Sequence, residues 1–298
     1  MNMLIKGLAG LLINFRCGSV VLSCIVSLPL PALAETIEAK LPSGITAYAE
    51  FRQGTSSQTA VLSLHGFLQT HHSQPMSMLA SNLAAAGYTV LSPTISLGIN
   101  RRKQSMACEA VHTHTMDDEA GEVAYWVDWL VSRGYKDIVP VGFSSTGNIS
   151  LLLYNIQSAH PHIKKMILTS FNPIHINLAA HTKLLANAKN KSEGEKIARY
   201  SAGYCKNNFS STLNSYLSYS AFVDDKILEL ISQATIPLEI ILGSADTVLP
   251  ANWQEKIMAR NPRARIHTVN RANHFFEGTT ELDLADSVES ILKTTATY

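Results

Sequence analysis

Short, continuous apolar runs alternate along the chain with stretches whose apolar residues have helical spacing. The runs have the character of parallel strands buried on both faces, and they lie at residues 60–64, 88–91, 137–143, 165–169, 237–242 and 264–269. The stretches with helical spacing lie at 75–86, 116–133, 149–156 and 282–292. This alternation predicts an α/β fold with a doubly wound, mostly parallel sheet. Residues 37–51, which alternate weakly around a Pro-Ser-Gly turn, predict a hairpin at the edge of that sheet.

One segment is too long for a simple crossover between strands. About sixty residues separate the strand that ends near Ser170 from the strand that begins at Pro237. Four stretches inside the segment have a helical pattern, at 179–188, 192–202, 212–221 and 226–234. We therefore expect an inserted helical cap, residues 174–236, over the carboxyl ends of the strands, where loops shape the ligand sites of open α/β sheets.

The N-terminal segment, residues 1–34, has the pattern of a secretory signal peptide. Its only charges are Lys6 and Arg16, and residues 20–30 are almost wholly apolar. Small residues at the −3 and −1 positions then favour cleavage after Ala34. We therefore expect an exported protein, either periplasmic or secreted.

Two other interpretations of this segment are open. An uncleaved membrane anchor is disfavoured because Pro29 and Pro31 close the apolar run, and because Arg16 interrupts it too early for a span of ~20 residues. A lipoprotein modified at Cys24 is disfavoured because little apolar sequence separates Arg16 from that cysteine. Cleavage leaves residues 35–298, or 298 − 34 = 264 residues, enough for one large α/β domain.

The charge of the predicted mature chain is nearly balanced. It carries 24 − 2 = 22 basic and 23 acidic side chains, so its net charge is −1. This balance gives no indication of nucleic acid as a partner. No second apolar run is long enough to cross a membrane, so we expect no stable membrane span after cleavage.

The cysteines predict a covalent cross-link. Two of the four, Cys17 and Cys24, leave with the leader, and Cys108 and Cys205 remain. In an oxidising compartment such a pair predicts a disulfide. Two separate buried thiols are the alternative.

A serine turn follows the apolar run at 137–143. The run reaches Gly142, Ser144 follows two residues later, and a helical stretch begins soon after. A sharp turn of this kind lifts the serine hydroxyl clear of the sheet and places the Ser145 N–H at a helix N-terminus, facing a developing oxyanion. The glycine usual at +2 is Thr146, with Gly147 at +3, so Ser145 is an alternative nucleophile. Gly142 at −2 favours Ser144.

A carboxylate and a histidine follow two later strands. Asp246 lies just past the run at 237–242, and His274 just past the run at 264–269. A carboxylate so placed can accept the Nδ1–H of a histidine and orient its ring toward a serine. Each residue alone has a simpler role, as a helix cap or a packed core residue. Their order, Ser144, Asp246, His274, each after a separate predicted strand, favours a catalytic triad.

From about residue 60 onward the chain resembles the α/β-hydrolases of the serine esterase and lipase type. Four motifs carry the resemblance, namely the oxyanion loop His65-Gly66-Phe67, the elbow Gly142-Phe143-Ser144-Ser145, the acid turn Gly243-Ser244-Ala245-Asp246 and the histidine loop Asn273-His274-Phe275. The resemblance implies acyl transfer, in which Ser144 attacks a carbonyl, His274 carries the proton and Asp246 holds the imidazole. It also implies an oxyanion hole made by the N–H groups of Phe67 and Ser145, and it requires no metal or organic cofactor.

We therefore expect an exported serine hydrolase that cleaves the ester of a small molecule or a lipid-like compound. A thioesterase, an amidase or a small peptidase on the same triad is an alternative, because leaving-group preference resides in pocket shape. A non-catalytic binding module with the same fold is a second alternative, and Thr146 is the feature in its favour. The pairs His71-His72 and His112/His114 lack a recognisable metal-ligand pattern and are expected to be solvated loop residues, with substrate contact as the other option.

Overall fold

The computed structural model describes residues 34–55, 59–187 and 196–294. The predicted signal peptide, residues 1–34, lies outside these ranges apart from Ala34. No helix within the described ranges is long and apolar enough to cross a membrane.

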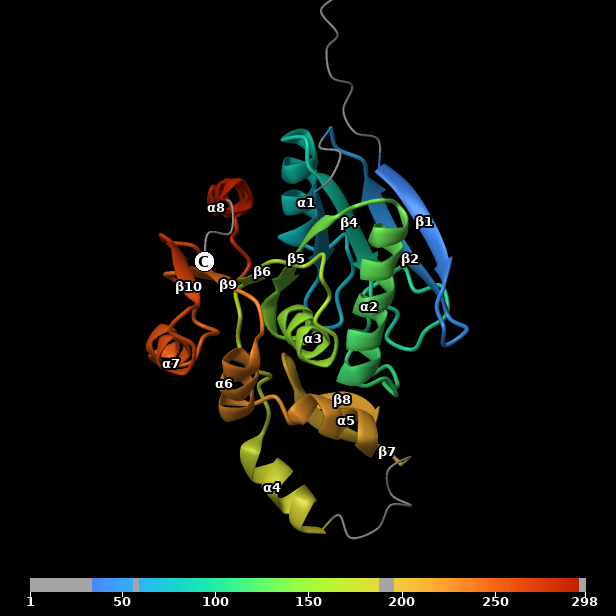
Figure 1. Ribbon diagram of the computed structural model, residues 1–298. Helices are drawn as coiled ribbons and strands as arrows, with labels where there is room; N and C mark the ends of the chain where they lie inside the picture. The colour runs from blue at the N-terminus through green and yellow to red at the C-terminus, as the bar shows by residue number, and fades with distance from the viewer. Residues whose placement is uncertain (1–33, 56–58, 188–195, 295–298) are drawn as a thin grey trace, which may run out of the picture. The chain divides into compact units, whose positions relative to one another are not determined.

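Eight strands of the described chain form one mixed sheet in the order β1-β2-β4-β3-β5-β6-β9-β10 (Figure 1). Their bounds are β1 (Ala34–Lys40), β2 (Thr46–Arg52), β3 (Thr59–Leu64), β4 (Thr89–Thr94), β5 (Asp137–Phe143), β6 (Met166–Thr169), β9 (Leu238–Gly243) and β10 (Arg265–Val269). β1 and β2 form an antiparallel hairpin at one edge, and β2 is antiparallel to β4. All other neighbours are parallel. The predicted mostly parallel sheet with an edge hairpin is confirmed.

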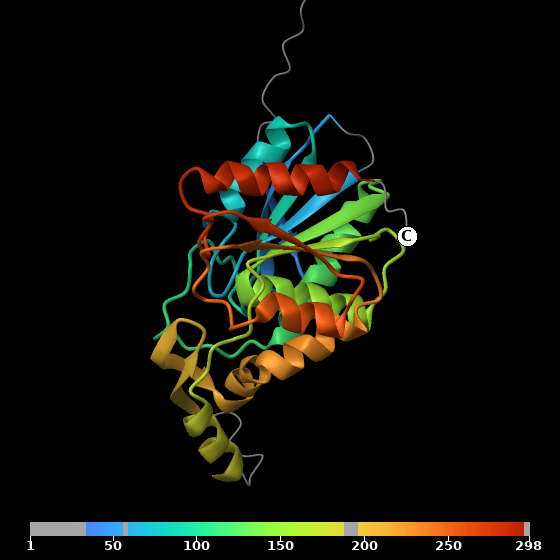
Figure 2. The same cartoon turned by 90° about the vertical axis from the view of Figure 1, so that its left-hand side faces the viewer.

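Helices cover both faces of this sheet. α1 (Met76–Ala85) packs beside α8 (Thr280–Lys293) on one face, as Figure 2 shows. α2 (Met116–Ser132), α3 (Ser144–Gln157) and α7 (Trp253–Arg260) belong to the core on the other face. β3 explains why the strands are continuously apolar, since Val61 faces α1 and α8 while its neighbour Leu62 faces α2 and α3.

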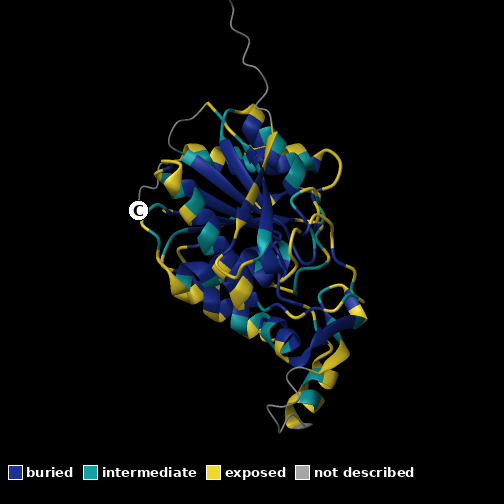
Figure 3. Cartoon of the chain, turned by 90° about the vertical axis from the view of Figure 1, so that its right-hand side faces the viewer, coloured by how far each residue is buried: buried dark blue, intermediate teal, exposed yellow. Residues whose placement is uncertain are grey.

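The segment predicted as a helical cap contains a β-hairpin. Its elements are α4 (Leu178–Asn187), β7 (Ile197–Ala202), β8 (Cys205–Thr212), α5 (Leu213–Ser220) and α6 (Asp224–Gln233). The helix predicted at 192–202 is therefore wrong from Ile197 onward, where the chain pairs antiparallel with β8. The pairing is supported by packing, because the Tyr200 ring stacks on the Tyr216 ring with centroids 4.1 Å apart. α4 is mostly exposed (Figure 3).

The hairpin is attached to the loop between β4 and α2. The predicted disulfide is present, with Cys108 and Cys205 5.6 Å apart at their Cα atoms. Backbone hydrogen bonds run alongside it, from Ser210 N–H to the Cys108 carbonyl at 2.9 Å and from His112 N–H to the Ser210 carbonyl at 2.9 Å. Because both kinds of link act on β8, the hairpin is fixed over the carboxyl ends of the strands.

Candidate functional site

Ser144 occupies the sharp turn between β5 and α3. Its backbone is left-handed, with φ of 59°, a conformation that is unusual for a non-glycine residue and typical of strained functional turns. Strand and helix meet closely there, because a Cβ on Gly142 would lie 2.5 Å from Asn148 Oδ1 and 2.9 Å from the Gly147 carbonyl oxygen. The glycine at −2 is therefore required by the geometry of the turn.

A second close approach explains why Thr146 is tolerated. A Cβ on Gly147 would lie 2.6 Å from the His65 carbonyl oxygen and 3.1 Å from that of Leu64. The first turn of α3 thus meets the end of β3 at the +3 position rather than at +2. Thr146 is buried, and the strained backbone is that of Ser144.

Asn148 holds the turn in place, and sequence reasoning missed it. It is fully buried, and its Nδ2 donates to the Ser144 carbonyl oxygen and, at 2.9 Å, to the Thr169 carbonyl oxygen. The elbow is therefore tied to the end of β6. In the sequence Asn148 is one of several polar residues near the start of this helix, and nothing there marks it out.

The structure brings the three predicted triad side chains together. The Ser144 Oγ lies 2.9 Å from His274 Nε2, and His274 Nδ1 lies 2.8 Å from Asp246 Oδ2. Asp246 Oδ1 accepts the Val248 N–H at 2.8 Å, which fixes the carboxylate. The Asp246 side chain is 0% exposed and that of His274 is 9% exposed. Of the two adjacent serines, it is the Ser144 hydroxyl that contacts the histidine.

The loop after β3 passes directly beside Ser144. A Cβ on Gly66 would lie 3.1 Å from Ser144 Cβ. Phe67, the next residue, has an N–H with no hydrogen-bond partner in the described chain. Ser145 lies in the first turn of α3, where N–H groups lack an intrahelical acceptor. Two unpaired donors of the predicted oxyanion hole are thus carried by segments that flank the serine.

Buried polar contacts hold this loop. His65 Nδ1 donates to the Gly66 carbonyl at 2.8 Å, and His65 Nε2 accepts the Ile95 N–H at 3.0 Å. Burial, and then the charge of Arg102, lower the pKa of His65 to about 3, so the ring is neutral, as this pattern requires. Arg102 itself is buried and donates to the carbonyl oxygens of Ile95 and Gln69.

A cavity of about 460 Å³ opens beside the triad. Its wall includes the aromatic rings of Phe67, Phe143, Tyr204 and Phe275. Its polar lining includes Lys206, which comes, like Tyr204, from the β7–β8 hairpin. Such a cavity fits a mainly apolar small-molecule group.

The hairpin turn rests on Phe67. The Phe67 and Tyr204 ring centroids are 5.5 Å apart, and a Cβ on Gly203 would lie 2.8 Å from Phe67 Cδ1. The Phe67 ring also contacts Phe209 and Tyr219, with centroids 5.7 Å away in each case. The cap and the loop that carries the predicted oxyanion donor are therefore packed as one unit.

Two histidines expected in solvated loops are buried under the hairpin. His112 is 0% exposed and stacks on Phe209 with ring centroids 4.4 Å apart, and His114 is 3% exposed. Neither lines the cavity at the triad. The expectation was wrong because the loop is covered by β8, a contact that local sequence does not reveal.

A buried carboxyl, Glu119, links α2 to α3, the helix that follows the Ser144 turn. Glu119 of α2 accepts a hydrogen bond from the Tyr219 hydroxyl and another, at 3.1 Å, from the Ser150 hydroxyl of α3. Burial raises the pKa of Glu119 to about 7. Glu119 lies in the acidic first turn of α2, within the helical stretch predicted at 116–133, and its burial could not be read from that pattern.

The sequence matches no protein-family profile and no curated protein. Solved structures are similar in fold. GrgF, an α/β-hydrolase from Penicillium sp. sh18, is 13% identical with a TM-score of 0.67 and covers 86% of this chain and 97% of its own. Est1E from Butyrivibrio proteoclasticus, in complex with ferulic acid, is 17% identical with a TM-score of 0.63 and covers 86% and 97%. An esterase from Pyrococcus furiosus is 17% identical with a TM-score of 0.58 and covers 88% and 91%. The chain therefore has the α/β-hydrolase fold.

Proposed function

We propose that this protein is a serine hydrolase that cleaves carboxylic esters through an acyl-enzyme intermediate. The observation that carries the proposal is the hydrogen-bonded series from Ser144 to His274 to Asp246, at 2.9 and 2.8 Å. A hydroxyl is a weak nucleophile until a neighbouring base accepts its proton, and a neutral imidazole oriented by a carboxylate is such a base.

In the first half of the reaction, Ser144 Oγ attacks the substrate carbonyl while its proton passes to His274 Nε2. The Asp246 carboxylate stabilises the imidazolium that forms, through the hydrogen bond at Nδ1. The negative charge on the carbonyl oxygen is met by the N–H groups of Phe67 and Ser145. Removal of one such donor typically costs on the order of 10²–10³ in kcat.

The second half regenerates the enzyme. His274 first gives the proton to the leaving alcohol as the ester C–O bond breaks, and a water molecule takes the place of the alcohol. His274 then accepts a proton from that water as it attacks the acyl-enzyme. When the bond between Ser144 Oγ and the acyl carbon breaks, His274 returns this proton to Oγ and the carboxylic acid leaves. The left-handed backbone of Ser144 supports this order of steps, because Ser144 occupies a turn just past β5 and lines the cavity.

The aromatic rings in the wall of the cavity favour a substrate whose acyl group is apolar and carries a ring. Ferulic acid bound to Est1E makes aromatic acyl esters reasonable first substrates for this chain. The β7–β8 hairpin supplies Tyr204 and Lys206 to the wall. We accordingly assign substrate selection to the cap, residues 174–236.

We also propose that the mature protein functions outside the cytoplasm after removal of residues 1–34. The disulfide between Cys108 and Cys205 supports this assignment, because such bonds persist in oxidising compartments. N-terminal sequencing of protein recovered from the exported fraction tests it, and an intact N-terminus there would contradict cleavage after Ala34.

Labelling with a fluorophosphonate tests the catalytic proposal. We expect wild type and Ser145→Ala to be labelled on Ser144, and Ser144→Ala to remain unlabelled. Matched ester, thioester and amide substrates then define the bond that is cleaved. Absence of label on folded wild-type protein would refute an activated serine and favour a binding module.

A further inference from the structure

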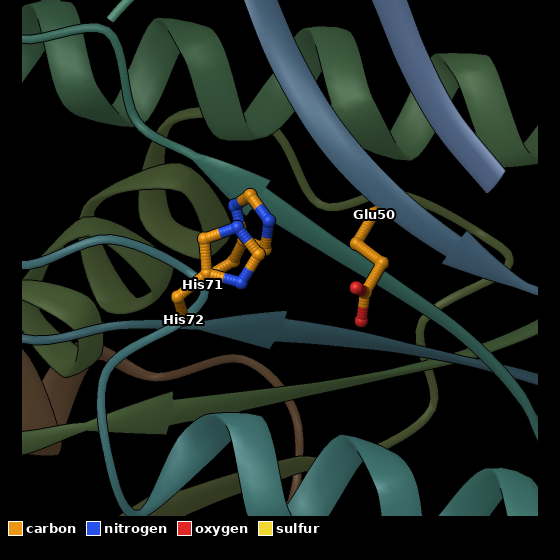
Figure 4. Close-up of side chains that lie close together, drawn as sticks. All are labelled: Glu50, His71 and His72. Carbon is orange, nitrogen blue, oxygen red and sulfur yellow. The ribbon is translucent and has the colours of Figure 1, made fainter. Parts of the chain in front are cut away.

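A second cluster of chemically active side chains lies away from the triad. Glu50 projects from β2, and His71 and His72 lie in the loop that follows β3 (Figure 4). One ligand atom from each of the three side chains lies within 4.8 Å of the other two. The two imidazole rings are adjacent, with centroids 3.9 Å apart. These are the donor types of a two-histidine, one-carboxylate metal site.

Two of the three side chains are held by partners that leave a ligand atom free. His71 Nδ1 lies 2.5 Å from Thr94 Oγ1, and the His71 backbone N–H donates to the same oxygen at 3.2 Å. With Nδ1–H donated to Thr94, the lone pair of His71 Nε2 is available. Glu50 Oε1 accepts from Arg52 Nε at 2.7 Å, which leaves Oε2 available. Metal ligands in proteins are usually oriented by outer partners of this kind.

The third side chain, His72, has no hydrogen bond among the described residues that would explain its position. His72 is exposed, and its ring has no hydrogen-bond partner in the described chain. Its position against His71 places two imidazoles side by side at a point where neither packs in the core. A cation between the rings and the carboxylate would use all three side chains.

We propose that Glu50, His71 and His72 bind one divalent transition-metal ion, with Zn²⁺ as the best match and water in the fourth position. Bonds of about 2.0–2.1 Å in tetrahedral geometry place ligand atoms about 3.3 Å apart. The three side chains therefore draw together on binding. Rotation of the exposed His72 ring and of the half-buried Glu50 side chain provides this movement, while Thr94 keeps the His71 ring in place.

The ion would add a link between β2 and the loop after β3, which already meets the sheet through Thr94 of β4. Glu50 belongs to β2, and His71 lies four residues after Phe67 in the loop that passes beside Ser144. A bound ion would thus cross-link that loop to the sheet. Its role is structural, and it takes no part in the acyl-transfer steps proposed above.

Calorimetric titration of tag-free, chelator-treated protein with ZnCl₂ tests this site. We expect one saturable site per chain, and a Co²⁺ absorption spectrum typical of tetrahedral coordination. His71→Ala and His72→Ala should each weaken Zn²⁺ binding at least tenfold, and Thr94→Val should weaken it about 10–100-fold through the lost outer partner. Because His72 is exposed, its variant keeps the fold, which circular dichroism verifies.

A matched control lies elsewhere in the chain. His160 and His162 also form a histidine pair, with ring centroids 5.3 Å apart and Asp128 3.9 Å from His160 Nε2. His162→Ala should leave Zn²⁺ binding unchanged. Absence of saturable binding to wild type, or wild-type affinity for Zn²⁺ in His71→Ala or His72→Ala, would overturn the proposal. Fluorophosphonate labelling of the same metal-free protein reports on Ser144 separately, so failure of one proposal leaves the other intact.

Discussion

Removal of the Cys108–Cys205 disulfide should destabilise the protein strongly. The bond closes a loop with a sequence separation of 97 residues. In the chain-entropy model, release of a loop of this size increases the entropy of the unfolded chain by an amount worth about 4.7 kcal/mol at 25 °C. Measured losses for native disulfides are typically about 2–5 kcal/mol, so we expect the double variant Cys108→Ala/Cys205→Ala to fall in this range.

Urea denaturation of the wild type and the double variant measures the effect. The midpoint should fall, and the dependence of the free energy of unfolding on urea gives the loss. Wild type unfolded in the presence of dithiothreitol should show a similar loss, while dithiothreitol should not affect the variant. A loss below about 1 kcal/mol would contradict the reasoning, because the closed loop would then contribute little entropy.

The same variant should retain its nucleophile. Backbone hydrogen bonds from β8 to residues 108–112 remain, so the hairpin stays near the cavity but its turn is less constrained. We expect a higher KM for esters with large acyl groups and preserved labelling of Ser144. Loss of labelling in the folded variant would show that the disulfide positions the triad itself.

Three further variants test individual contacts. Gly147→Ala places a Cβ 2.6 Å from the His65 carbonyl oxygen and should lower the free energy of unfolding, measured by urea denaturation, by about 1–3 kcal/mol. Thr146→Ala adds no atoms and should be tolerated. Equal stability of wild type and Gly147→Ala would contradict the close approach. Asp246→Asn should lower kcat by on the order of 10⁴ with a small change in KM, and an unchanged kcat in a steady-state ester assay would remove Asp246 from the mechanism. Glu119→Gln tests the buried carboxyl, whose pKa is raised by burial from 4.5 to about 7, so its folded form holds a proton that the unfolded chain releases. Wild type should therefore lose up to about 3 kcal/mol of stability relative to Glu119→Gln as pH rises from about 4.5 to about 7, and a difference independent of pH would refute the assignment.

The sheet could be predicted from the sequence because its signal is local. Ala60 and Leu62 pack on one core and Val61 on the other, so β3 must be apolar at successive positions. Parallel neighbours end at the same edge of a sheet, and β5, β6, β9 and β10 are consecutive there. For this reason Ser144, Asp246 and His274, each just past a strand, could be expected to lie close together.

The cap and the buried residues around the triad, such as Glu119 and Asn148, could not be predicted in the same way. Their structure depends on contacts with residues far away in the sequence. The residues from Ile197 to Ala202 are compatible with a helix until β8, the disulfide and Tyr216 are present to hold them as a strand. Glu119 is typical of a helix N-terminus until Tyr219, a hundred residues later, covers it. Asn148 resembles an ordinary helical amide, and only the fold shows the two carbonyl oxygens that it joins.

Phe67 has two roles, one for its ring and one for its backbone N–H, and together they constrain how substrate preference can change. Its ring supports the turn of the β7–β8 hairpin, and its N–H is one of the two donors assigned to the oxyanion. A substitution at Gly203 or Tyr204 that reshapes the cavity also changes the packing of the Phe67 ring, and through it we expect the Phe67 backbone to shift. Altered substrate preference and altered turnover should therefore arise together in natural or laboratory evolution, and a gain in one will need compensation in the loop after β3.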